Sequence, residues 1–222
     1  MEQKKHSEVL SIPAGNIQMQ GELIIPPNAQ SLVIFSHGSG SSRFSPRNNF
    51  VAKVLQNRGI ATFLLDLLSK EEDEVYANRF NINLLTERLI IATKYLSVFR
   101  QKTENFDFGY FGASTGAASA IKAAAALPEL IQSVVSRGGR PDLAMDVVPD
   151  VKAATLLIVG ELDKQVIELN KNVFNMLRCT KSIKVVKGAT HLFEEPGTLE
   201  EVALMASDWF SKYLQPLKEK TI

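Results

Sequence analysis

Short apolar segments, rich in β-branched and aromatic residues, recur along this chain without the polar–apolar alternation of a half-buried strand. Strands of a parallel sheet have this composition because helices cover both of their faces. Stretches with apolar residues at helical spacing lie between these segments. Strands that alternate with helices build βαβ units, so the sequence predicts an α/β fold with a doubly wound, mostly parallel sheet and helices on both faces. The predicted strands cover residues 31–36, 60–66, 106–111, 131–136, 154–159 and 183–186.

The start of the chain follows a different pattern, in which polar and apolar residues alternate over 9–12 and 17–25 around Pro13-Ala14-Gly15-Asn16. This pattern predicts an antiparallel hairpin, which we expect to extend one edge of the sheet. The polar segment 69–81 has no period, and we expect it to be irregular. The predicted helices lie around 50–55, 84–96, 114–127, 166–177 and 199–214.

Length and composition limit the kind of protein. A chain of 222 residues with 45% hydrophobic residues can bury a full core, and we expect a single domain over 1–222 without a separate lid domain. Lys and Arg number 25 against 24 Asp and Glu, which does not suit a dedicated nucleic-acid binder. One cysteine, Cys179, excludes an intrachain disulfide and a cysteine-based zinc site. No apolar run reaches the roughly 18–20 residues of a membrane span and no secretory signal is visible, so we expect a soluble, cytoplasmic protein without a membrane partner.

A Gly-x-Ser-x-Gly motif, Gly112-Ala113-Ser114-Thr115-Gly116, lies between a predicted strand and an alanine-rich predicted helix. In this context the serine stands on a tight turn with its hydroxyl exposed. The N-terminus of the following helix places partial positive charge near a developing oxyanion. The alternative is a Gly/Ser turn that serves packing only, but the position between strand and helix favours Ser114 as a nucleophile.

A serine nucleophile needs a base, which is usually histidine. His6 lies in a polar N-terminal segment, and His37 directly follows a predicted strand. His191 lies after the last predicted strand and C-terminal to Ser114, which is the order that nucleophile and base have in α/β hydrolases. The sequence therefore predicts His191 as the base.

An acid that orients the base should lie between Ser114 and His191. Asp163 follows the predicted strand 154–159, and loops at strand ends gather at one edge of such a sheet. We predict Asp163 as this acid, while Asp142 and Glu161 remain alternatives.

Acyl transfer also requires N–H donors for the oxyanion of the tetrahedral intermediate. Thr115 N–H, directly after the nucleophile, is one predicted donor. A loop after an early strand supplies the other, and we predict Ser39 N–H for this role. His37, in the same loop, is predicted to hold the loop by hydrogen bonds.

Arginines stand near the loops of the predicted site, and a guanidinium group binds carboxylate or phosphate. Arg137 lies at a strand end between the predicted nucleophile and acid, and Arg43 follows the Gly/Ser loop. We predict both as substrate-binding residues, which would suit an anionic small-molecule substrate. Solvated loop charge is the alternative. Two further arginines of these loops are Arg47 and Arg140.

Four motifs follow one another along the chain: His37-Gly38-Ser39-Gly40-Ser41-Ser42-Arg43, Gly112-Ala113-Ser114-Thr115-Gly116, Gly160-Glu161-Leu162-Asp163 and Gly188-Ala189-Thr190-His191. With these motifs, the whole chain resembles the α/β-hydrolase fold and, within it, the dienelactone-hydrolase-like branch. The resemblance implies Ser114 as nucleophile, Asp163 as acid and His191 as base, in a hydrolase without cofactor or metal. The dienelactone hydrolases that gave the branch its name have cysteine at the nucleophile position. Ser114 therefore argues against ring opening of dienelactone as the reaction.

The sequence thus predicts a serine esterase that cleaves a small ester or lactone through an acyl-enzyme. Alternatives on the same fold are a non-catalytic small-molecule-binding protein and a thioesterase or peptidase.

Overall fold

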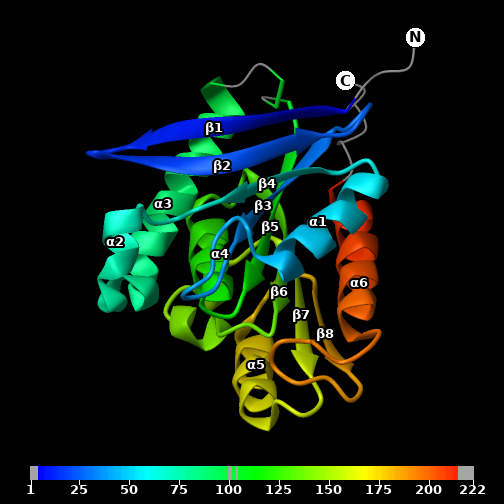
Figure 1. Ribbon diagram of the computed structural model, residues 1–222. Coiled ribbons are helices and arrows are strands. Elements are labelled where there is room, and N and C mark those ends of the chain that lie inside the picture. Colours follow the sequence, from blue (N-terminus) through cyan, green and yellow to red (C-terminus); the bar gives the residue numbers. More distant parts are fainter. Residues whose placement is uncertain (1–4, 100–101, 104, 215–222) are drawn as a thin grey trace.

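The computed structural model describes residues 5–99, 102–103 and 105–214, which form an eight-stranded sheet with helices around it (Figure 1). The strands are β1 His6–Ala14, β2 Ile17–Ile25, β3 Ser31–Ser36, β4 Ala61–Leu65, β5 Asp107–Ala113, β6 Ile131–Arg137, β7 Ala154–Gly160 and β8 Lys181–Val186. The α-helices are α1 Pro46–Asn57, α2 Lys70–Glu74, α3 Ile82–Lys94, α4 Thr115–Ala126, α5 Lys164–Met176 and α6 Thr198–Tyr213. Short 3-10 helices are η1 Tyr76–Phe80, η3 Pro141–Ala144 and η4 Val148–Asp150, and η2 Tyr95–Phe99 is π-helical.

The strands follow the order β1-β2-β4-β3-β5-β6-β7-β8. All neighbours from β4 to β8 are parallel, whereas β1 pairs with β2, and β2 with β4, in antiparallel fashion. The predicted α/β class, doubly wound sheet and N-terminal hairpin at the edge are confirmed. The order places the carboxyl ends of β3, β5, β6, β7 and β8 at one edge, where ligand sites of such sheets form.

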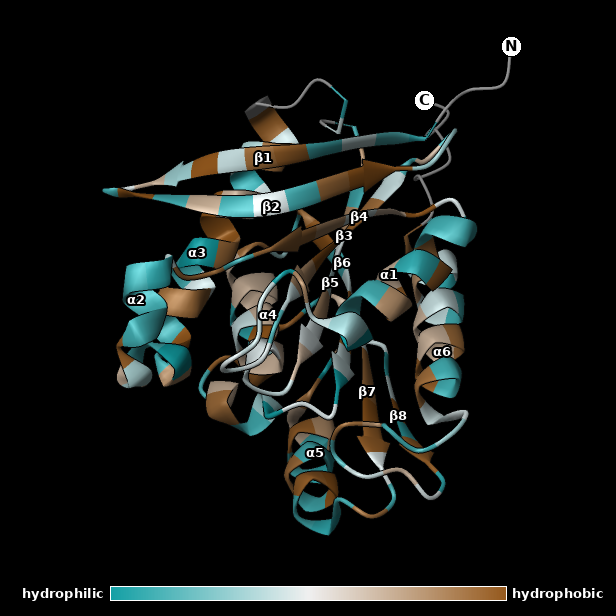
Figure 2. Ribbon diagram, viewed as in Figure 1, coloured by the Kyte–Doolittle hydropathy of each residue, from teal (hydrophilic) through white to brown (hydrophobic). Residues whose placement is uncertain are grey.

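Two apolar cores lie on opposite faces of the sheet. On one face, Leu89 of α3, Ile121 of α4 and Val173 of α5 belong to one buried cluster. On the other face, Leu55 of α1 and Phe210 of α6 belong to a second cluster. Figure 2 shows apolar residues along the strands β4 and β7 and mostly hydrophilic residues on α2. This distribution is what a sheet covered on both faces requires. No helix of the described residues is long and apolar enough to cross a membrane.

The segment 69–81, predicted to be irregular, is helical: it contains α2 and η1. The prediction was wrong because it missed a capping box at the start of α2. Ser69 Oγ accepts a hydrogen bond from Glu72 N–H, and Glu72 Oε2 accepts one from Ser69 N–H. These two bonds satisfy backbone donors at the start of the helix, so polar residues form a helix without an apolar period.

Arg88 of α3 ties the hairpin to the rest of the fold. Its side chain is buried, Nη1 donates to the carbonyl of Ala14 at 2.6 Å, and Nη2 donates to Glu72 Oε1 at 2.8 Å. One guanidinium group therefore joins β1, α2 and α3.

The variant Arg88→Met tests the contribution of this tie to stability. We expect the free energy of unfolding to fall by about 3 kcal/mol, because removing one partner of a buried ion pair leaves an uncompensated charge. Chemical denaturation measures this change. The control is Lys171→Met, which breaks the exposed pair of Lys171 with Glu168 and should cost less than about 1 kcal/mol. Equal losses in the two variants would contradict the assigned role of Arg88.

Candidate active site

Ser114 stands between the end of β5 and the start of α4, in a backbone conformation that residues other than glycine rarely adopt. Its φ is 50° and its ψ is −123°. Such a conformation costs roughly 1–3 kcal/mol and persists only where the surroundings enforce it. Two hydrogen bonds do so here: Ser114 N–H donates to the carbonyl of Arg137 at 3.3 Å, and Arg140 N–H donates to the carbonyl of Ser114 at 2.9 Å. The loop after β6 thus holds the turn from one side.

The two glycines of the motif allow the turn to pack closely. A Cβ atom at Gly112 would lie 2.5 Å from Cα of Ala117, and one at Gly116 would lie 2.2 Å from the carbonyl oxygen of Ser36. Both distances are far shorter than a van der Waals contact, and in each case the atom that a Cβ would meet belongs to the backbone and cannot move aside. Only glycine lets α4 approach β3 and β5 in this way.

His191, in the loop after β8, forms a hydrogen bond with Asp163, which directly precedes α5. His191 Nδ1 and Asp163 Oδ2 are 2.6 Å apart. The carboxylate can only accept, so Nδ1 carries a proton, and in the neutral ring the lone pair is on Nε2. The structure brings these two predicted residues together, and an imidazole held in this tautomer can take a proton at Nε2.

The other candidate acids are bound elsewhere. Both oxygens of Asp142 accept hydrogen bonds from the guanidinium of Arg140, each at 2.9 Å. Glu161 Oε2 accepts a hydrogen bond from Gly188 N–H at 2.8 Å. Of the three predicted candidates, only Asp163 contacts His191 among the described residues.

The end of β6 connects the serine and the histidine. The carbonyl of Arg137 accepts the Ser114 N–H. A Cβ atom at the next residue, Gly138, would lie 3.0 Å from the carbonyl oxygen of His191 and 3.6 Å from His191 Nδ1. The dipeptide Arg137-Gly138 therefore borders Ser114 on one side and His191 on the other.

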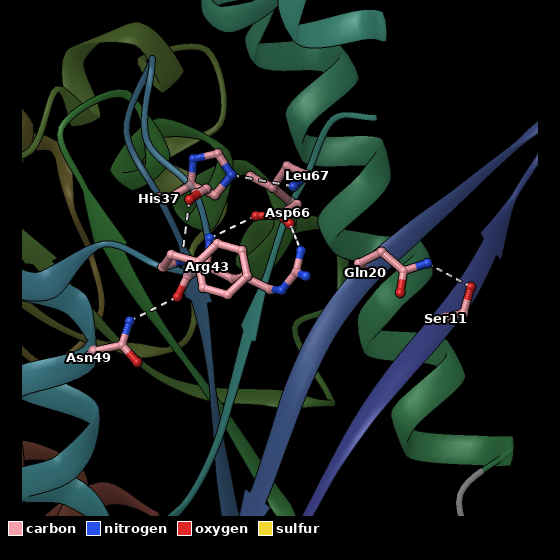
Figure 3. A network of polar contacts seen from close by, with 9 residues as sticks. Ser11, Gln20, His37, Arg43, Asn49, Asp66 and Leu67 are labelled. Atoms are coloured by element: carbon pink, nitrogen blue, oxygen red, sulfur yellow. Dashed lines mark hydrogen bonds and ion pairs between the residues drawn. The ribbon is translucent and has the colours of Figure 1, made fainter. Parts of the chain in front are cut away.

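The loop after β3 packs directly against the serine. A Cβ atom at Gly38 would lie 3.0 Å from Cβ of Ser114. His37 holds this loop: its Nδ1–H donates to the carbonyl of Gly38 at 2.9 Å, and its Nε2 accepts from Leu67 N–H at 3.3 Å (Figure 3). These are the loop-fixing bonds predicted for His37.

Ser39 N–H, a predicted oxyanion donor, already has a hydrogen-bond acceptor in this structure. It donates to the hydroxyl oxygen of Thr115 at 2.9 Å. The Thr115 hydroxyl thus ties the loop after β3 to the first turn of α4. Sequence reasoning missed this bond, because no local pattern links a threonine to an amide 76 positions away.

The predicted substrate-binding arginines have different surroundings. Arg43 forms an ion pair with Asp66 through its guanidinium, and its backbone N–H donates to the same carboxylate at 2.7 Å (Figure 3). The charge of Arg43 is therefore balanced within the chain. Arg137 is only 7% exposed, and its Nη2 donates to Asn48 Oδ1 at 3.2 Å. No carboxylate among the described residues forms an ion pair with Arg137.

Asn48 is a further residue of this region that sequence reasoning missed. It is 2% exposed and lies on the face of α1 that also buries Val51, Ala52 and Leu55. A polar residue at the helical spacing of an apolar stripe is the signal that could have found it. By contrast, Phe50 of the same helix is 38% exposed.

Within the part of the chain that the structure describes, no group of three or more His, Cys, Asp or Glu side chains is arranged to hold a metal ion.

Comparison with known proteins places the chain among hydrolases. No family model matches it. Over 207 residues it is 50% identical to a Mycobacterium tuberculosis protein whose name proposes a phosphoribosyl transferase. That match covers 93% of this chain but 46% of the relative, so the chain spans about half the length of the curated relatives it matches.

Among solved structures, a dienelactone hydrolase from Anabaena variabilis is 48% identical, with a TM-score of 0.92 over 96% of this chain and 100% of that one. The protein Est1E from Butyrivibrio proteoclasticus is 15% identical, with a TM-score of 0.79 over 92% and 98% of the two chains. The latter similarity concerns the fold alone.

Burial of His37 predicts a pH dependence of stability. Desolvation lowers the pKa of His37 below its ordinary value of 6.5, so the folded protein holds this imidazole neutral. The unfolded chain then binds the extra proton first, and stability present above pH 6.5 is lost as the pH falls below that value. The variant His37→Gln lacks this imidazole, so the part of the stability loss that His37 causes should disappear.

Unfolding free energies measured between about pH 7.5 and 5 check this prediction. The control is His6→Gln, which changes a half-exposed histidine on the edge strand β1. A His37→Gln variant with the pH dependence of the wild type would contradict it.

Proposed function

Because the chain belongs to the dienelactone-hydrolase-like branch of the α/β hydrolases, we propose that it is a serine hydrolase that cleaves a small ester or lactone. The single observation that carries the proposal is the hydrogen bond of 2.6 Å between His191 Nδ1 and Asp163 Oδ2. It prepares a base at the same sheet edge as Ser114, whose strained turn suits an exposed nucleophile.

In the proposed first step, Ser114 Oγ attacks the carbonyl carbon of the substrate while His191 Nε2 takes the hydroxyl proton. The imidazolium that forms is stabilised by Asp163, which keeps its charge and the orientation of the ring. The tetrahedral intermediate collapses when the alcohol leaves with the proton from His191. This gives an acyl-enzyme on Ser114. Water, activated by His191, then attacks the acyl group and frees the serine.

We assign the oxyanion to the N–H groups of Thr115 and Ser39. Thr115 N–H lies at the first turn of α4, where the helix N-terminus adds partial positive charge. Ser39 N–H donates to the Thr115 hydroxyl before substrate binds, so it has to exchange this acceptor for the oxyanion. The exchange replaces a neutral acceptor by a charged one, which forms the stronger hydrogen bond.

The rim of the site suits a substrate with an apolar part. Leu162 and Leu192, neighbours of Asp163 and His191, are 56% and 40% exposed, and Phe44 in the loop after β3 is 70% exposed. These side chains follow the carboxyl ends of three strands, at the edge where the substrate would enter. We propose that they contact the apolar part of the ester.

We do not propose phosphoribosyl transfer as the activity of this chain. The name that suggests it describes a protein about twice as long as the matched segment, and the residues assigned above account for ester hydrolysis instead.

The variants Asp163→Asn and Asp142→Asn test the proposed site with 4-nitrophenyl acetate as substrate. Asp163→Asn should lower kcat by on the order of 10⁴-fold, because the ring then loses its orientation and tautomer. Asp142→Asn removes a carboxylate at a similar place in the sheet that binds Arg140 instead of His191, and should retain most of the activity. The reverse result, or equal losses, would overturn the assignment of Asp163.

A further inference from the structure

Arg137 is a buried cation that lacks a counter-ion within the described chain. It is 7% exposed, its Nη2 binds the neutral amide of Asn48, and its Nε is buried without a hydrogen-bond partner among the residues that the structure describes. Buried charges in proteins are normally paired and hydrogen-bonded, because desolvation of an unpaired charge is costly. Burial, together with the nearby charge of Arg47, lowers the pKa of Arg137 to about 10, so the group still carries its charge at neutral pH.

Arg47, at the start of α1, directly precedes Asn48, to which the guanidinium of Arg137 donates, so it is a second cation in this region. Its Nε is also buried without a partner among the described residues. Its Nη1 binds Glu194 Oε1 at 2.7 Å, and the Glu194 side chain is 62% exposed. Of the two guanidinium groups, only that of Arg47 has a carboxylate partner among the described residues, and this carboxylate lies at the surface, where water can replace its contact.

The backbone at Arg137 and the loop that carries Glu194 lie beside the proposed catalytic residues. The carbonyl of Arg137 binds Ser114 N–H, and the next residue, Gly138, contacts His191. Glu194 follows His191 by three positions in the same loop. Both arginines are therefore connected to the segments that carry the proposed catalytic residues, Arg137 through its backbone and Arg47 through Glu194.

We propose that Arg137 and Arg47 form a subsite for an anionic group of the substrate, and that Glu194 occupies this subsite through Arg47 until the substrate displaces it. The guanidinium fork binds the paired oxygens of a carboxylate or phosphate through two parallel hydrogen bonds. The substrate then supplies the negative charge that the pair lacks. This inference rests on the proposed hydrolase function. Arg43 takes no part in the subsite, because Asp66 already balances its charge.

Two pairs of esters test the proposal and locate the anionic group. For an acid on the acyl side, 4-nitrophenyl hydrogen glutarate is compared with its methyl ester. For an acid on the alcohol side, 4-acetoxybenzoate is compared with its methyl ester. In each pair the ratio of kcat/KM for the charged ester to that for the neutral ester reports the contribution of the anion.

Arg47→Gln and Glu194→Gln break the same ion pair but should shift this ratio in opposite directions. In at least one ester pair, we expect Arg47→Gln to lower the ratio about 10-fold, because it removes a cation that binds the anion. Glu194→Gln should raise the ratio about threefold, because it removes the internal competitor. Arg137→Gln should lower the ratio as Arg47→Gln does. If Arg137→Gln does not fold, the half-buried Arg47 and the exposed Glu194 keep the test available.

Ratios that stay unchanged in Arg47→Gln and Glu194→Gln for both ester pairs, or that move in the same direction in both variants, would overturn the proposal. That result would reduce the ion pair to a structural tie of α1 to the loop of His191. Failure of the hydrolase function itself gives a different result, because wild-type protein would then hydrolyse neither the charged nor the neutral esters.

Discussion

The backbone turn at Ser114 holds the proposed site together, because three separate elements meet at this residue. Gly116 brings α4 against the carbonyl of Ser36 at the end of β3, and Gly38 brings the following loop against Ser114 itself. From the other side, Arg137 and Arg140 bind the backbone of Ser114 after β6. A strained φ of 50° can persist in such surroundings. The position of the serine hydroxyl thus depends on backbone packing that only glycine permits.

Of the four arginines in the loops around this turn, all but Arg137 have a carboxylate partner among the described residues. Asp66 balances Arg43, Asp142 balances Arg140, and Glu194 balances Arg47. These pairs involve the loops after β3, β4, β6 and β8, and the pair of Arg47 with Glu194 ties α1 to the loop that carries His191. The exception is Arg137, whose guanidinium contacts the amide of Asn48 and is desolvated without an acid. A cation left in this state is consistent with a site that is completed by its substrate.

The inner strands of the sheet could be predicted from sequence because they are buried on both faces and contain few polar residues: β3 matches the predicted range 31–36 in full. The helix α2 could not be predicted from periodicity, because a capping box at Ser69 and Glu72 starts it rather than an apolar stripe. The candidate acid remained open between Asp163, Asp142 and Glu161, since all three follow strands. Their hydrogen-bond partners distinguish them, and spacing along the chain does not encode those partners. The bond between Ser39 N–H and Thr115 Oγ1 has no local signature at all.

Intact-mass measurement after treatment with a fluorophosphonate tests most directly whether Ser114 is an activated nucleophile. The account predicts one adduct on the wild-type protein, none on Ser114→Ala, and slow or no labelling of His191→Ala, because the hydroxyl needs the base to react. A folded wild-type protein that takes no label, or a Ser114→Ala variant that is labelled as fast as the wild type, would contradict it.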